Sequence, residues 1–170
     1  MILKKNLVFL GMMGSGKSSI GYLVSKKLKL MFTDIDNLIE EECGVNISEI
    51  FKTRGEGYFR ILEEKITLNA LKEVNKVISL GGGSFINDKV RKEVLTNHIS
   101  FWLDWDESIL VERIKNSKKR PLAFQATDQD IKQLIKKRTR IYSKAQFKIN
   151  CDKLTKIEIV NKIIKIYELN

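Results

Sequence analysis

Residues 11–18 read Gly11-Met12-Met13-Gly14-Ser15-Gly16-Lys17-Ser18, which fits the pattern G-x-x-x-x-G-K-[ST] at every fixed position. Glycines allow the backbone to curl so tightly that its N–H groups surround phosphate oxygens. A helix that starts at the end of such a loop also points its positive N-terminus at these oxygens. The lysine of the pattern reaches the terminal phosphates, and the serine offers its hydroxyl to Mg²⁺. The stretch therefore predicts a phosphate-binding loop between a strand and a helix.

The segments around this loop alternate between two patterns. Short apolar runs predict strands at 7–10, 31–33, 77–80, 99–103 and 147–149. Helical spacing predicts helices at 18–29, 38–42, 48–51, 56–74, 90–95, 107–114, 131–142 and 155–167, with a loop at 116–128. Ser48, Asn87 and Thr155 stand where helix N-caps are expected. The alternation predicts an α/β fold with three layers, a parallel sheet between two layers of helices.

The composition limits the class of protein. Hydrophobic residues make up 43% and charged residues 31% of the 170 residues, which suits one globular domain over 1–170 without a linker. No apolar run approaches the ~18 residues that cross a bilayer. Cys43 and Cys151 lack CxxC or metal-ligand spacing, so we expect two small buried or half-buried thiols. We expect a cytoplasmic protein with no membrane partner.

The net charge of +10 lies entirely in the last third of the chain. Residues 111–170 hold 16 Lys and Arg against 6 Asp and Glu. Such a region can attract a polyanion, or nucleotide phosphates and a carboxylate, or it can simply form the solvated faces of helices. No helix-turn-helix, zinc or RNP pattern is visible, and no aromatic residues interleave with the lysines. We therefore assign most of the charge to solvated helix faces, and we expect no nucleic-acid partner.

Charged residues at predicted strand ends narrow the class of phosphate-loop protein. Asp34 and Asp36 follow the second strand, where one carboxylate can hold a water of the Mg²⁺ shell and the other can accept a hydrogen bond from a substrate hydroxyl. Capping of the next helix is the alternative, and both roles can coexist. Arg120 lies in the irregular segment, which suggests a lid over about 115–128. No N-K-x-D-like signature is present, which argues against a GTPase.

Six motifs occur in the order of one known family. They are residues 11–18, Thr33-Asp34-Ile35-Asp36, Phe59-Arg60 with Glu63, Leu80-Gly81-Gly82-Gly83, Arg120-Pro121-Leu122, and Arg138 with Tyr142 four residues later. Together they resemble shikimate kinase, from the first strand to about Phe147. The resemblance implies the nucleoside-monophosphate-kinase-like fold, a five-stranded parallel sheet in the order 2-3-1-4-5. It also implies transfer of the γ-phosphoryl group of ATP to the 3-hydroxyl of shikimate, with Mg²⁺, on the route to chorismate and aromatic amino acids.

The resemblance also implies roles for single residues. Arg60 and Arg138 would clamp the shikimate carboxylate, with Glu63 orienting the arginines. Asp36 would bind ring hydroxyls and could act as base, and the N–H groups of residues 81–83 would line the ring. The residues implied to bind ATP are Gly14, Ser15, Gly16, Lys17, Ser18, Ser19, Arg113 near the adenine, and Arg120 on the transferring phosphate. Lys17, Asp36 and Arg120 would be catalytic, while Ser18 and Asp34 would share the Mg²⁺ shell, Asp34 through water.

The chain also departs from the family pattern, and two other functions stay open. Ser19 stands where the family often has Thr, the segment 138–142 lacks a usual proline, and the loop 150–154 lacks the Arg and Pro often seen near the adenine. One alternative is another small-molecule kinase of this fold, similar to gluconate kinase. The other is a non-catalytic nucleotide- or nucleic-acid-binding module. We expect a monomer, with His98 at a surface or strand edge and with Trp102 and Trp105 packed on the sheet.

Overall fold

The computed structural model describes residues 5–117 and 126–169. Its centre is one five-stranded parallel sheet in the order β2-β3-β1-β4-β5. The strands are β1 (Leu7–Leu10), β2 (Met31–Asp34), β3 (Lys76–Ser79), β4 (Ile99–Asp104) and β5 (Phe147–Asn150). The α/β class, the parallel sheet and the strand order 2-3-1-4-5 are thereby confirmed.

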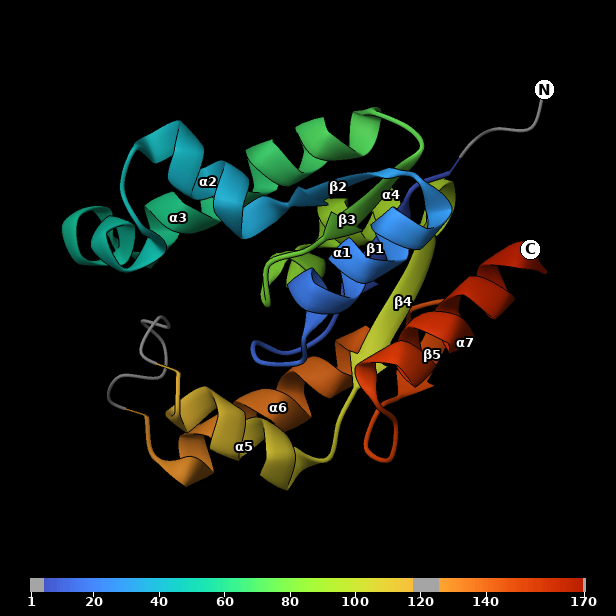
Figure 1. Cartoon of the computed structure of the whole chain (residues 1–170). Coiled ribbons are helices and arrows are strands. Elements are labelled where there is room, and N and C mark those ends of the chain that lie inside the picture. Colours follow the sequence, from blue (N-terminus) through green and yellow to red (C-terminus); the bar gives the residue numbers. More distant parts are fainter. Residues whose placement is uncertain (1–4, 118–125, 170) are drawn as a thin grey trace.

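Helices follow the strands along the chain (Figure 1). They are α1 (Lys17–Leu28), α2 (Ile35–Cys43), α3 (Ile47–Lys72), the short 3₁₀ helix η1 (Ser84–Ile86), α4 (Asp88–Asn97), α5 (Glu107–Lys115), α6 (Asp128–Tyr142) and α7 (Lys156–Glu168). Asn87 caps α4, and Thr155 opens α7 with a capping box, both as expected.

Two hydrophobic cores cover the two faces of the sheet. Val8 and Leu10 of β1 point into the core shared with α2 to α6. Leu7 and Phe9 alternate to the opposite face and meet α1 and α7. β1 is buried on both faces, which explains its continuous apolar run. The three-layer arrangement is therefore built from the alternation of side chains along the central strand.

The expected helix boundaries are partly confirmed. The two helices expected at 48–51 and 56–74 lie within α3 on either side of Gly55, whose non-helical backbone (φ 78°) kinks the span as the expected division indicates. The cap of α3 is Asn46, whose side chain accepts the Glu49 N–H at 2.8 Å, and not Ser48. α2 begins at Ile35, three residues earlier than expected, because the Asp34 side chain accepts hydrogen bonds from two N–H groups of its first turn.

His98 is also placed differently from the expectation. It caps the C-terminal end of α4 and only 4% of its surface is exposed. Within the described part of the chain, neither ring nitrogen has a hydrogen-bond partner, and Nε2 lies 3.7 Å from a Glu93 carboxylate oxygen. Cys43 and Cys151 are free thiols, half-buried and buried as expected. Among residues 5–117 and 126–169, no helix has the length and apolarity needed to cross a membrane.

The carboxyl ends of the strands bring the sequence motifs to one edge. The phosphate-loop motif follows β1, Asp34 ends β2, Gly81 to Gly83 follow β3, and Trp105 follows β4. From β1 the chain first runs to β2 and β3 on one side of β1, and then crosses from β3 to β4 on the other side, so the strand order reverses next to β1. Ligands of open α/β sheets bind outside the strand ends at such a switch point. The site is expected there.

Candidate active site

The loop after β1 has the geometry of a phosphate cradle. Gly14 (φ 80°) and Gly16 (φ 87°) take left-handed backbone conformations that side chains rarely adopt, and Gly16 caps α1. The N-terminus of α1 follows at Lys17. Ser19 Oγ donates to the Gly16 carbonyl at 3.1 Å, which closes the first turn. The loop and helix terminus therefore form an anion site of the kind that the motif predicts.

Lys17 lies along the inside of this loop. Its Nζ donates to the carbonyl oxygens of Gly11 at 3.0 Å and Met12 at 2.9 Å, and only 8% of the residue is exposed. These two carbonyl acceptors are neutral. Phosphate oxygens carry negative charge, and charge-assisted hydrogen bonds are about twice as strong as neutral ones. The lysine is therefore placed to move onto an arriving phosphate.

Two side chains hold the loop from outside. Trp105 Nε1 donates to the Ser15 carbonyl at 2.9 Å, and Arg113 Nη1 donates to the Gly14 carbonyl at 3.3 Å. The Arg113 guanidinium carbon lies 3.9 Å from the centre of the Trp105 ring. Trp105 packs on the sheet as expected, but its contact with the loop was missed. The only sequence signal was an aromatic residue directly after the fourth strand.

The predicted metal residues face one cavity of about 380 Å³. Its lining includes Ser18, Asp34, Asp36, Phe59, Arg60 and Arg138. Ser18 Oγ lies 3.5 Å from Ser79 Oγ. Asp34 Oδ1 caps α2, so the capping interpretation is correct for Asp34, whereas Asp36 lies inside the first turn. Hydroxyl and carboxylate oxygens are ligands that suit Mg²⁺ together with water.

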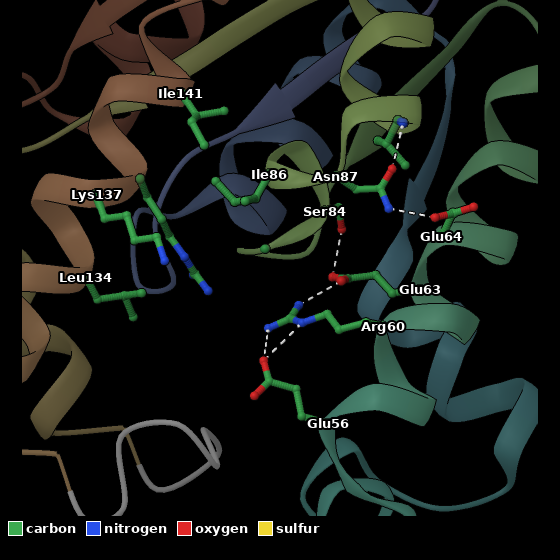
Figure 2. Close-up of a pocket in the computed structure, with 13 residues that line it drawn as sticks. Glu56, Arg60, Glu63, Glu64, Ser84, Ile86, Asn87, Leu134, Lys137 and Ile141 are labelled. Atoms are coloured by element: carbon green, nitrogen blue, oxygen red, sulfur yellow. Dashed lines mark hydrogen bonds and ion pairs between the residues drawn. The ribbon is translucent and has the colours of Figure 1, made fainter.

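A charged cluster on α3 forms another wall of the cavity. Arg60 Nη1 donates to Glu63 Oε2 at 2.7 Å, and Glu63 Oε1 accepts the Ser84 hydroxyl at 2.7 Å (Figure 2). Arg60 also donates to Glu56 at 3.1 Å. Burial lowers the pKa of Arg60, but the two carboxylates outweigh this effect and raise it. Glu63 is 3% exposed and therefore orients Arg60 from a buried position.

The three glycines after β3 pack directly against this cluster. A Cβ on Gly81 would overlap the Glu63 carboxylate and lie 2.8 Å from Asp36 Oδ1. A Cβ on Gly83 would overlap the Arg60 guanidinium. The absence of side chains thus lets the backbone after β3 approach Glu63, Asp36 and Arg60 together. These residues, which the sequence assigned to one site, are brought together by the fold.

Helix α6 supplies the second arginine. Arg138 is 7% exposed, and its Nη1 donates to the Gly82 carbonyl at 3.1 Å. The Tyr142 hydroxyl, one turn later, donates to the same carbonyl oxygen. Burial raises the pKa of Tyr142 to about 12, so the hydroxyl stays protonated as a donor. This second anchor of the glycine segment was not predicted, although the i, i+4 spacing of Arg138 and Tyr142 was visible.

A second cavity of about 390 Å³ adjoins the first and shares lining residues with it. Arg60 and Arg138 line both cavities. Figure 2 shows the second cavity between Arg60 on α3 and the opposite wall of Leu134, Lys137 and Ile141 on α6. Arg120 and most of the expected lid lie outside the described residues. Ser117, at the start of that segment, lines the first cavity.

Comparison with known proteins places these features in one family. The family model described as "SKI: Shikimate kinase" matches residues 13–168. A shikimate kinase from Thermodesulfovibrio yellowstonii is 41% identical over 165 residues, which cover 96% of this chain and 95% of the relative.

The comparison of folds agrees with this result. The shikimate kinase from Acinetobacter baumannii, solved in complex with shikimate, superposes with a TM-score of 0.92 at 26% identity, over 98% of this chain and 94% of that one. A gluconokinase from Sinorhizobium meliloti superposes with a TM-score of 0.61 at 18% identity, over 98% and 94% of the two chains, and therefore shares the fold alone. By its sequence and by its fold, this chain belongs to the shikimate kinase family.

Proposed function

We propose that this protein transfers the γ-phosphoryl group of ATP to the 3-hydroxyl of shikimate. One observation carries the proposal beyond family membership. Ser18 of the phosphate loop and the two arginines Arg60 and Arg138 line a single cavity of about 380 Å³. A small anionic acceptor bound by the arginines would therefore lie beside the phosphates held by the loop.

The acceptor would be fixed by its charge and its hydroxyl groups. Arg60 and Arg138 bind its carboxylate, because a planar guanidinium fits a carboxylate with two hydrogen bonds. Glu63 positions Arg60 through the 2.7 Å hydrogen bond. The N–H groups of Gly81 to Gly83 bind along the ring. Asp36 accepts a hydrogen bond from the reacting hydroxyl and takes its proton as the phosphoryl group is transferred.

The donor would be held mainly by backbone. The N–H groups of residues 14–16 and the start of α1 bind the phosphate oxygens, with the side chains of Ser18 and Ser19 beside them. Lys17 exchanges its carbonyl partners for the phosphates. Arg113 packs against the adenine, and Arg120, from the lid expected over about 115–128, contacts the transferring phosphate.

The metal cofactor that we propose is Mg²⁺, with the Ser18 hydroxyl as ligand and Asp34 holding one of its waters. Bound there, it would supply positive charge beside the phosphate oxygens. Because such transfers need positioning and charge stabilisation above all, Lys17 and Arg120 provide the remaining charge from the protein itself. We also propose one domain over 1–170 acting as a cytoplasmic monomer, without a nucleic-acid or membrane partner.

The test is ADP release by the purified protein with ATP and Mg²⁺, with and without shikimate. We expect a large stimulation by shikimate and none by gluconate or nucleoside monophosphates. Stimulation by gluconate alone would instead support the gluconate-kinase-like alternative. Salt-sensitive binding to random DNA without any acceptor-dependent turnover would support the non-catalytic module.

A further inference from the structure

Trp105 occupies a position that the proposed function leaves unused. It follows β4 directly, precedes α5, and packs against both hydrophobic cores. Its indole Nε1 donates to the Ser15 carbonyl at 2.9 Å. Its ring centre lies 3.9 Å from the guanidinium carbon of Arg113. One side chain thus contacts both the phosphate loop and the arginine beside it.

The geometry of a phosphate loop explains why its outer contacts matter. When successive N–H groups converge on an anion, the carbonyl groups of the same peptides point away from it and need donors elsewhere. Trp105 supplies a donor for the Ser15 carbonyl, and Arg113 supplies one for the Gly14 carbonyl at 3.3 Å. Lys17 donates to carbonyl oxygens from the inside of the loop, but in the proposed function it moves onto the phosphates. The outer donors therefore hold the loop while a nucleotide is bound.

The stacked pair also defines a flat surface next to the loop. A Cβ on Gly14 would lie 3.3 Å from the Arg113 Cβ, so the stem of Arg113 packs on the loop. The indole covers one face of the guanidinium, and the residue is otherwise exposed. A guanidinium held in this way keeps its orientation and offers the opposite face to a planar base.

We propose that Trp105 is a positioning residue for the nucleotide, which fixes the phosphate loop through its N–H and the base-facing arginine through its ring. The proposal rests on the proposed binding of ATP and adds the residue that joins phosphate recognition to base recognition. The proposal predicts two effects that can be measured separately. The indole N–H should affect the binding of the phosphates, and the ring face should affect the binding of the base.

The test compares the binding of ADP and of pyrophosphate, each with Mg²⁺, by titration calorimetry without any acceptor. Trp105→Phe keeps an aromatic face and removes the N–H, so both ligands should bind about 3- to 10-fold more weakly. Trp105→Leu removes the face as well, and ADP alone should lose a further ~2- to 5-fold. Phe147→Leu is the matched control, because Phe147 stacks on Phe101 at 5.3 Å within the sheet.

The possible outcomes separate this proposal from the proposed function. Unchanged affinities in both Trp105 variants, or an equal loss in Phe147→Leu, would overturn the positioning role even if shikimate is phosphorylated. The expected pattern with ADP and pyrophosphate would support it even if shikimate is not the acceptor. If Trp105→Leu lowers the affinities for ADP and pyrophosphate equally beyond the loss in Trp105→Phe, the claim that the indole ring orients Arg113 for the base would be overturned.

A second measurement avoids any change at Trp105. The chain has two tryptophans, so in Trp102→Phe the tryptophan fluorescence, excited selectively over that of the four tyrosines, comes from Trp105 alone. We expect ADP to change its fluorescence strongly and pyrophosphate to change it much less, because only ADP brings a base onto the stacked arginine. An emission that does not respond to saturating ADP would contradict the proposal.

Discussion

The two sides of the cleft are held together by different kinds of interaction. On the acceptor side, charged side chains pair with one another, as Arg60 does with Glu63 at 2.7 Å. On the nucleotide side, the backbone forms the site, and the cation of Lys17 donates to carbonyl oxygens at 2.9 and 3.0 Å. Glu63 and Lys17 are both buried, and Glu63 forms its ion pair with Arg60 from that buried position.

We expect this difference to separate binding of the acceptor from catalysis. The acceptor clamp is already oriented, so its residues should act mainly on the affinity for the acceptor. We expect Lys17 to move from the carbonyl oxygens of Gly11 and Met12 onto phosphate oxygens when a nucleotide binds, and the gain should be largest where negative charge moves during transfer. Substitutions on the two sides should therefore change different kinetic constants.

The largest effect is expected for Lys17→Ala. Without the cation, the charge that moves between phosphate oxygens is left uncompensated, and kcat should fall by at least ~10²- to 10³-fold. The thermal midpoint should stay close to that of the unmodified protein. Lys26→Ala, an exposed lysine in the last turn of the same helix, is the control and should keep its kcat. An unchanged kcat in Lys17→Ala would remove the loop from the mechanism.

Arg138→Ala should have the next largest effect, on the acceptor alone. Loss of a buried partner of the carboxylate costs on the order of 2–5 kcal/mol, which should appear in the KM for shikimate and hardly in the KM for ATP. Steady-state kinetics with each substrate varied in turn measures the two constants. Arg140→Ala, on the exposed side of the same helix, is the control. Equal losses for both substrates would contradict the clamp.

Tyr142→Phe should have a smaller effect than Arg138→Ala, again on the KM for shikimate rather than on the KM for ATP. It removes one of the two donors to the Gly82 carbonyl and leaves Arg138 in place. The loss of one hydrogen bond corresponds to about 0.5–1.5 kcal/mol, or about a 2- to 10-fold rise in the KM for shikimate. An effect of the same size on ATP would show that Tyr142 supports the fold in general rather than the acceptor side.

The smallest effect concerns stability, away from the cleft. Burial lowers the pKa of His98 from its ordinary value of 6.5, in spite of the opposing charge of Glu93. The unfolded chain therefore binds a proton more readily, and stability should fall as the pH drops below about 6.5. Thermal unfolding at pH 7.5 and 5.5 measures this loss. His98→Phe should reduce the difference between the two values, and a difference of unchanged size would contradict the assignment.

Much of the fold could be predicted because its signals are local. The loop motif and the alternation of apolar runs gave the parallel sheet, while the strand order came from the family resemblance. The start of α2 and the cap of α3 differ from the expectation because short polar side chains decide them. Asp34 and Asn46 cap these helices from positions that the apolar pattern does not mark.

The candidate site could be predicted only where the residues form motifs. Arg60, Glu63 and the glycines do so, and the fold brings them together. Trp105 and Tyr142 contact backbone groups 90 and 60 residues away, and no local pattern announces such a contact. His98 was expected nearer the surface, but it is buried because α4 packs against β4. A tertiary contact of this kind leaves no local pattern in the sequence. The roles of all these residues in turnover stay predictions.

The most direct test of the central claim is to follow the phosphoryl group itself by ³¹P NMR. The protein would be incubated with ATP, Mg²⁺ and shikimate until the ATP signal disappears. We predict one new phosphomonoester, on the 3-hydroxyl of shikimate, formed in equal amount to ADP. ADP accompanied only by inorganic phosphate, or no ester at all, would contradict the claim that the clamp and the phosphate loop place these two groups together.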